Sequence, residues 1–119
     1  MSSYREMLVW QKSMDLVDAV YRTVRRFPRE ELFVLSAQMR SAAISIPCNI
    51  AEGCGREGDL ELARFCIIAR GSATELEYQL LLARDFKLIE LEDYEKLSAQ
   101  TVEIKRMLTV LVQKLTAKS

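Results

Sequence analysis

The 119-residue chain contains no histidine, only two prolines and four glycines, and only three cysteines. Histidine is the commonest general base and a frequent metal ligand, so its absence excludes Glu-x-x-His di-iron sites and argues against an enzyme. The shortage of proline and glycine leaves little of the chain for loops. The plentiful Ala, Leu, Glu, Arg and Gln favour helix instead.

Cysteine is both scarce and wrongly spaced for a structural site. Cys48, Cys54 and Cys66 are odd in number and contain no CxxC pair. Cys48 and Cys54 are six residues apart, which places them on different faces of a helix. We therefore expect small buried apolar residues at these positions, with no disulfide framework and no zinc site.

The chain also lacks an excess of charge and any long apolar run. Its 17 basic residues balance 17 acidic ones, so composition alone gives no attraction to nucleic acid or membrane. The N-terminus has no uninterrupted apolar stretch typical of a signal peptide, and no stretch approaches the roughly 20 residues that cross a bilayer. We expect a cytoplasmic protein, without membrane contact, that forms a single domain over residues 1–119.

Nucleotide-binding loops are missing as well. The glycine-rich stretch GCGREG at residues 53–58 lacks the Lys-Ser/Thr ending of a Walker loop, and it follows a predicted helix where dinucleotide binding needs a strand. Ser45, Ser72 and the cysteines have no evident activating base. The sequence predicts no catalytic, cofactor-binding or metal-binding residue, and the chain is not expected to be an enzyme.

The first two predicted helices have broad apolar faces. The first, from about Leu8 to Arg26, gathers its apolar residues in an arc of roughly 160°, wider than one neighbour requires, and ends at Phe27-Pro28. The second is expected to begin at Pro28. Its apolar seam recurs at alternating steps of three and four, at Leu32, Leu35, Met39, Ala42, Ile46, Asn49 and Gly53.

Pro47 interrupts this second helix because it removes one N–H donor and crowds the preceding turn. The apolar residues keep the same phase on both sides of Pro47, which favours one kinked helix over two separate helices. Gly53, Gly55 and Gly58 are expected to supply the stop and the turn that follow.

The third helix, from Asp59 as N-cap to Phe86, has two apolar faces. One face consists of Leu62, Phe65, Ala69, Ser72, Ala73, Leu76, Leu80 and Ala83. The other consists of Leu60, Ala63, Ile67, Gly71, Thr74, Tyr78 and Leu81. After a short link around residues 87–91, the fourth helix shows a single narrow stripe from Tyr94 to Leu115. The pattern predicts an all-α fold: an antiparallel up-down-up-down four-helix bundle with a proline-kinked second helix.

One such bundle cannot bury both faces of two helices, and large exposed apolar patches normally mark interfaces. The sequence therefore predicts a homo-oligomer. The expected interface residues lie on the surplus faces of the second and third helices: Phe33, Ala37, Ile44, Ala51, Ala63, Ile67, Gly71 and Tyr78.

Two polar features keep alternative interpretations open. Gln38, Asn49, Glu52 and Arg56 form a strip on the second helix, either a solvated face or a buried network that fixes helix register. Basic residues gather toward one end of the predicted bundle, as an ordinary solvated surface or as contacts to nucleic-acid phosphates. These are Arg5, Lys12, Arg56, Arg64, Lys105, Arg106, Lys114 and Lys118.

Several segments together resemble the four-helix-bundle proteins encoded in 23S ribosomal RNA intervening sequences. The matching pieces are LVWQKSMDLVDAVY (8–21), Phe27-Pro28, QMRSAAISIPCNIAEGCGR (38–56) and RFCIIARGSATELEYQLLLAR (64–84). The motif positions that carry over include Asn49, Glu52, Arg56, Arg70, Ser72, Glu75 and Glu77. The resemblance implies a homopentamer, and a fold shared with the basic, nucleic-acid-binding accessory protein of diversity-generating retroelements.

The chain departs from the family pattern at Ser41, where a second basic residue is usual, and at Phe86-Lys87, where a glycine is usual. Its balanced charge also differs from the basic retroelement relative. Together, residues and resemblance favour a non-enzymatic, homo-oligomeric binding module without a cofactor. Its expected partner is nucleic acid or a nucleic-acid-processing protein. The alternative is a structural or protein-interaction scaffold with no affinity for nucleic acid.

Overall fold

The computed structural model describes residues 3–117, which form four long α-helices and two short 3-10 helices without any strand. The predicted all-α class is confirmed. The α-helices are α1 (Leu8–Val24), α2 (Leu35–Cys54), α3 (Asp59–Asp85) and α4 (Leu91–Thr116). The 3-10 helices are η1 (Tyr4–Glu6) and η2 (Arg29–Glu31). Within this described part, no helix combines the length and apolar character needed to span a bilayer.

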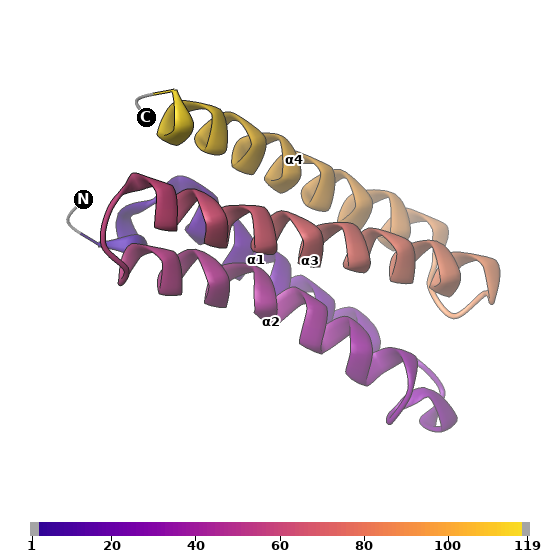
Figure 1. Ribbon diagram of the computed structural model, residues 1–119. Coiled ribbons are helices and arrows are strands. Elements are labelled where there is room, and N and C mark those ends of the chain that lie inside the picture. The colour runs from indigo at the N-terminus through magenta and orange to yellow at the C-terminus, as the bar shows by residue number, and fades with distance from the viewer. Residues whose placement is uncertain (1–2, 118–119) are drawn as a thin grey trace.

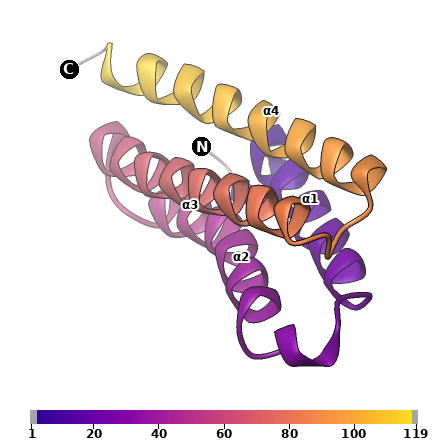
Figure 2. The same ribbon diagram turned by 90° about the vertical axis from the view of Figure 1, so that its right-hand side faces the viewer.

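The helices pack as a slender body measuring 47 × 20 × 20 Å. Helix α3 contacts α2 and α4, and α1 contacts the same two helices. Figure 1 shows the start of α1 and the end of α4 at the same end of the molecule as the α2–α3 connection. Figures 1 and 2 both show the α1–α2 connection projecting away from α3 and α4.

The core is built from the faces that the periodicity predicted. On α3, the face from Leu62 to Ala83 is buried apart from the half-buried Ser72. On α2, the seam residues Leu35, Met39, Ala42, Ile46 and Gly53 are buried. Side chains of α1 and α4 complete the core, including Leu16, Val20, Ile104 and Leu108, which are all at most 1% exposed. Burial of this apolar surface is the main contribution that holds the helices together.

Helix α2 begins later than predicted. Pro28 has an extended backbone (φ −57°, ψ 152°), so it cannot be the first residue of an α-helix. Between Pro28 and the first helical residue, Leu35, lie the short helix η2 and Val34, whose backbone (φ −116°, ψ −98°) is not helical. Leu32 was predicted to lie in the core seam, but it belongs to this projecting connection and is 43% exposed.

Helix α2 continues through Pro47, which is buried inside it. The interpretation as one helix is therefore correct. The glycines after it behave differently from one another. Gly58 has a positive φ of 89° and is the N-cap of α3, a position that had been assigned to Asp59. Gly53, expected to be part of the stop, is helical and buried against α3.

Replacing Gly53 with alanine is expected to destabilise the protein. The added Cβ would lie 2.8 Å from the Phe65 Cβ and 3.0 Å from the Leu62 Cδ1, closer than van der Waals contact allows. Overpacking of this kind costs about 1–3 kcal/mol. Urea denaturation followed by circular dichroism should show a lower midpoint.

Gly55→Ala is the matched control, two residues along the same chain segment. Gly55 has φ −83°, and the atom nearest to an added Cβ would be the Glu52 carbonyl oxygen at 3.5 Å, an ordinary contact distance. Its stability should be unchanged or raised by up to about 1 kcal/mol. Equal midpoints for Gly53→Ala and the wild type would contradict the close packing of α2 on α3.

Candidate interaction surfaces

Exposed apolar side chains cover the outer sides of α2 and α3, here called the outer α2–α3 surface. Ile44 is 43% exposed on α2, while Ile67 and Tyr78 are 46% and 58% exposed on α3. Gly71 is also exposed, and Ala37 and Ala51 are half-buried. These predicted interface residues remain accessible in the single chain.

Two predicted interface residues lie elsewhere. Phe33 is 89% exposed, but it belongs to the projecting α1–α2 connection and precedes α2. Ala63 is only 2% exposed and belongs to the core. Its assignment to the outer face of α3 was wrong, because it lies at the edge of that face and its small side chain is covered by packing.

A polar contact joins α2 to α3 beside the apolar residues. The hydroxyl groups of Ser45 and Ser72 lie 2.8 Å apart and share a hydrogen bond. The Asn49 amide donates to the Ser45 carbonyl oxygen at 2.8 Å and lies 3.0 Å from the Ser45 hydroxyl oxygen. Asn49 is half-buried rather than enclosed in the core seam. The Ser45–Ser72 bond links the two helices, and the Asn49 amide contacts Ser45 from the next turn of α2.

The remaining motif residues make separate contacts and do not form one network. Arg70 donates to the Thr109 hydroxyl at 3.1 Å, and Glu77 pairs with Lys105 at 2.8 Å, so both connect α3 to α4. Glu75 is exposed and has no hydrogen bond or ion pair within the described chain. Of the motif residues, Asn49 and Ser72 belong to the group around Ser45 that links α2 to α3.

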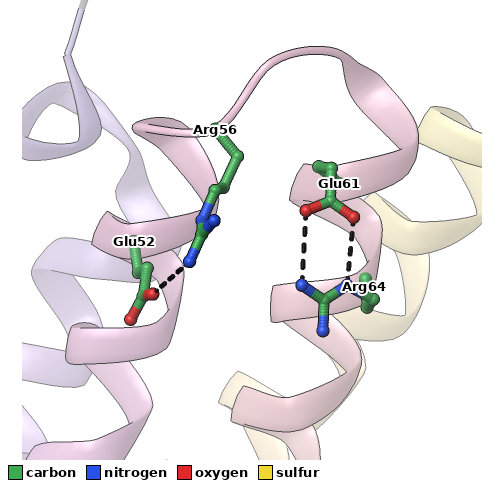
Figure 3. A network of polar contacts seen from close by, with 4 residues as sticks. All are labelled: Glu52, Arg56, Glu61 and Arg64. Atoms are coloured by element: carbon green, nitrogen blue, oxygen red, sulfur yellow. Dashed lines mark hydrogen bonds and ion pairs between the residues drawn. The ribbon is translucent and has the colours of Figure 1, made fainter.

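Figure 3 shows two further pairs at the α2–α3 turn. Arg56 pairs with Glu52 at 2.9 Å, and both side chains are about half exposed, which fits the solvated alternative for this strip. Arg64 donates two bonds to Glu61, at 3.0 and 3.3 Å. The hydrogen bond from Arg64 lowers the pKa of Glu61, and the same bond raises the pKa of Arg64.

Both guanidinium groups also cover the ring of Phe65. The Arg56 group lies 5.2 Å from the ring centroid and the Arg64 group lies 4.6 Å from it. Arginine over an aromatic face gains cation–π attraction. Each arginine is therefore held by a carboxylate and by a ring before any partner arrives.

Of the other predicted nucleic-acid contacts, some already pair with a carboxylate or lie over an aromatic ring, and others make no ion pair with the described residues. Lys12 pairs with Glu103 at 3.2 Å, Lys105 pairs with Glu77, and Arg5 covers the Tyr4 ring at 5.6 Å. Arg106 and Lys114 are exposed and have no ion pair with the described residues. Lys118 lies outside the described residues.

Two of the three thiols, those of Cys54 and Cys66, are partly or fully buried. Burial raises the pKa of Cys66 to about 11, and burial also raises the pKa of Cys54, whose sulfur lies 3.4 Å from the Met7 sulfur. Both are protonated at neutral pH. Cys48 is exposed, which corrects its prediction as buried. Among residues 3–117, no three Cys, Asp or Glu side chains are placed to hold a metal ion.

Sequence analysis missed an apolar groove between the start of α1 and the end of α4. The groove has a volume of about 430 Å³. It is lined by Met7, Leu8, Val9, Arg106, Met107, Val110, Leu111 and Lys114. Only the core stripe of α4 was recognised. The sequence does contain a pattern that could have indicated this groove. Val102, Arg106 and Val110 recur every four residues, which places them on one side of α4, away from its core stripe.

Comparison with known proteins now places the chain. Residues 5–110 match the model of the 23S rRNA-intervening sequence protein family. The chain belongs to that family. No curated protein matches it.

A crystal structure from Bacteroides thetaiotaomicron shows the same fold for a protein of unknown function from the S23 ribosomal protein family. It superposes with a TM-score of 0.80 at 26% identity, and the match covers 89% of this chain and 99% of the other. The four-helix all-α fold of this intervening-sequence protein is therefore shared with a solved structure over 89% of the chain.

The Ser45–Ser72 bond makes a measurable prediction for this family member. Removing either hydroxyl should lower stability by about 0.5–1.5 kcal/mol, because the partner hydroxyl loses its bond in a half-buried place. A double-mutant cycle of Ser45→Ala and Ser72→Ala, measured by urea denaturation, should give a coupling of about 0.5 kcal/mol or more. Thr74→Ala is the control, since its hydroxyl bonds only to the Arg70 carbonyl of its own helix. Additive losses for Ser45 and Ser72 would show that the bond does not hold the helices.

Proposed function

We propose that this intervening-sequence protein is a non-enzymatic, homo-oligomeric helical-bundle module that acts by binding. The exposed outer α2–α3 surface carries this proposal. Ile44, Ile67 and Tyr78 are each more than 40% exposed on long, regular helices, where burial against a partner would remove apolar area from water. A second copy of the chain is the partner that is always present at matching concentration.

The proposal includes an antiparallel order of the helices. Two ion pairs support it: Lys12 meets Glu103, and Arg26 meets Asp93 at 2.7 Å. The residue number rises along α1 as it falls along α4. A bend of α2 at Pro47 fits the projecting α1–α2 connection (Figure 1). The homopentameric state rests on the family resemblance alone. The proposal also places the protein in the cytoplasm.

The proposed partner is nucleic acid or a nucleic-acid-processing protein, bound at the end where the basic residues gather. Four of these residues are already in ion pairs with carboxylates. Ion pairs at the surface are weak because solvent screens them, so phosphate groups can replace the carboxylates. Oligomerisation would multiply the number of free cations, such as Arg106 and Lys114, on one assembly.

The alternative is a structural or protein-interaction scaffold without nucleic-acid affinity. The balanced charge of the chain favours it. So does the engagement of Arg56 and Arg64 with both carboxylates and the Phe65 ring. The two functions differ in one measurable property, a salt-dependent affinity for phosphate backbones.

Charge placed on the outer α2–α3 surface should dissociate the oligomer. The Ile67→Asp/Tyr78→Asp double variant would bury two carboxylates in the interface and should sediment as a monomer at micromolar concentration. Sedimentation velocity measures this directly. Leu91→Asp is the control, because Leu91 is 61% exposed at the start of α4 and lies outside the predicted interface. A wild-type chain that stays monomeric at micromolar concentration would defeat the oligomer proposal, as would a double variant that stays assembled.

An electrophoretic mobility-shift assay across a series of salt concentrations tests the proposed binding of nucleic acid. Structured RNA and duplex DNA should bind at low salt, and the affinity should fall steeply as salt rises. Replacing both Arg106 and Lys114 with alanine should reduce the slope of log K against log salt by about 0.7–0.9 for each lost phosphate contact. Arg22→Ala/Arg29→Ala, at the opposite end, is the control. If no mobility shift occurs even at low salt, nucleic-acid binding is ruled out and the scaffold is the remaining function.

A further inference from the structure

The apolar groove between α1 and α4 is a surface distinct from the outer α2–α3 surface. Its lining is mostly aliphatic and thioether, and it is open to solvent: Leu8 is 57% exposed and Val110 is 48% exposed. A neighbouring hollow of about 520 Å³ shares Arg106 and Val110 with it and extends to Val102. Between Val102 and Lys114, the two hollows together follow about 18 Å of α4, roughly three helical turns, with Arg106 between their apolar residues.

The two charged residues that line the groove itself are both basic, whereas Glu77 and Lys105 line the neighbouring hollow. Arg106 and Lys114 line the groove without an ion pair to any described residue, and the groove lining contains no carboxylate. The neighbouring acidic residues are occupied, because Glu103 pairs with Lys12 and Glu77 pairs with Lys105. The groove therefore combines an apolar floor with two uncompensated cations at its edge.

We infer that the α1–α4 groove binds an acidic amphipathic helix of a partner protein. Apolar residues of that helix, spaced i, i+3 or i+4 and i+7, contact Leu8, Met107 and Val110 on the floor. Its flanking carboxylates pair with Arg106 and Lys114. Helix-in-groove recognition uses this division between apolar anchors and charged edges. A nucleic-acid backbone fits less well, because phosphates gain nothing from an aliphatic floor. The inference adds a protein partner to the proposed binding module, and that partner competes with nucleic acid for Arg106 and Lys114.

Fluorescence anisotropy with two designed peptides tests this inference on the full chain. The first is a fluorescein-labelled 18-residue amphipathic helix with leucines on one face and glutamates beside them, and the second replaces every glutamate with lysine. The glutamate peptide should bind at least tenfold more tightly than the lysine peptide. Val110→Glu should weaken its binding at least tenfold, since it places a carboxylate on the apolar floor. Leu91→Glu, at an exposed site at the other end of α4 (61% exposed, against 48% for Val110), should leave binding unchanged.

A charge-swap variant distinguishes the proposed recognition from non-specific hydrophobic binding. Arg106→Glu/Lys114→Glu should lose affinity for the glutamate peptide and gain affinity for the lysine peptide, while circular dichroism and sedimentation stay as in the wild type. Equal affinity for both peptides, or no effect of Val110→Glu, would overturn the inference. So would dissociation of the oligomer by Val110→Glu, which would show that a second copy fills the groove. Displacement of the peptide by a single-stranded 20-nucleotide RNA at equal concentration would instead assign this surface to nucleic acid.

Discussion

The packing of α2 against α3 through small residues is the constraint on which the rest of the structure depends. Ala42, Ala43 and Gly53 of α2 are buried, as are Ala69 and Ala73 of α3. The separation of two packed helices depends on the side chains between them, so small residues permit a close approach. Gly53 shows how close, since a single added carbon would meet the Phe65 side chain. Ile67 and Tyr78 lie outside this packed face of α3 and are exposed, and they form part of the surplus apolar surface.

Periodicity predicted the long elements well because each face repeats over many turns. The buried face of α3 could be assigned residue by residue for that reason. Single positions were harder. Ala63 lies at the edge of its predicted face. Helical periodicity alone does not show whether a neighbouring helix covers a side chain as small as a methyl group at such an edge. Gly53 resembled a stop because two more glycines follow it closely, although its missing side chain serves packing. The start of α2 depended on the backbone of Pro28 and Val34, which apolar spacing does not encode.

The charged residues could be counted from the sequence, but their ion-pair partners could not be predicted from it. The sequence showed basic residues converging at one end, yet it could not show that Arg56 and Arg64 are both held against Phe65, or that Lys12 and Lys105 meet carboxylates on neighbouring helices. Those contacts depend on the relative rotation of the helices. They leave Arg106 and Lys114 as the available cations, and both line the apolar groove. These two cations therefore lie beside an apolar surface that suits an amphipathic protein helix better than a phosphate backbone.

The proposed ring and the proposed peptide groove are compatible for a geometric reason. A cyclic oligomer larger than a dimer needs two different complementary surfaces on each subunit, because every contact is head-to-tail. In the proposed ring, the outer α2–α3 surface would be one of them. The projecting α1–α2 connection would be the other: Leu32, Phe33 and Val34 are exposed there by 43%, 89% and 56% on a segment that stands away from the bundle (Figure 2). If Phe33 reaches the α3 of a neighbouring copy, the ring closes without using the α1–α4 groove, and that groove stays open on every subunit for a second partner.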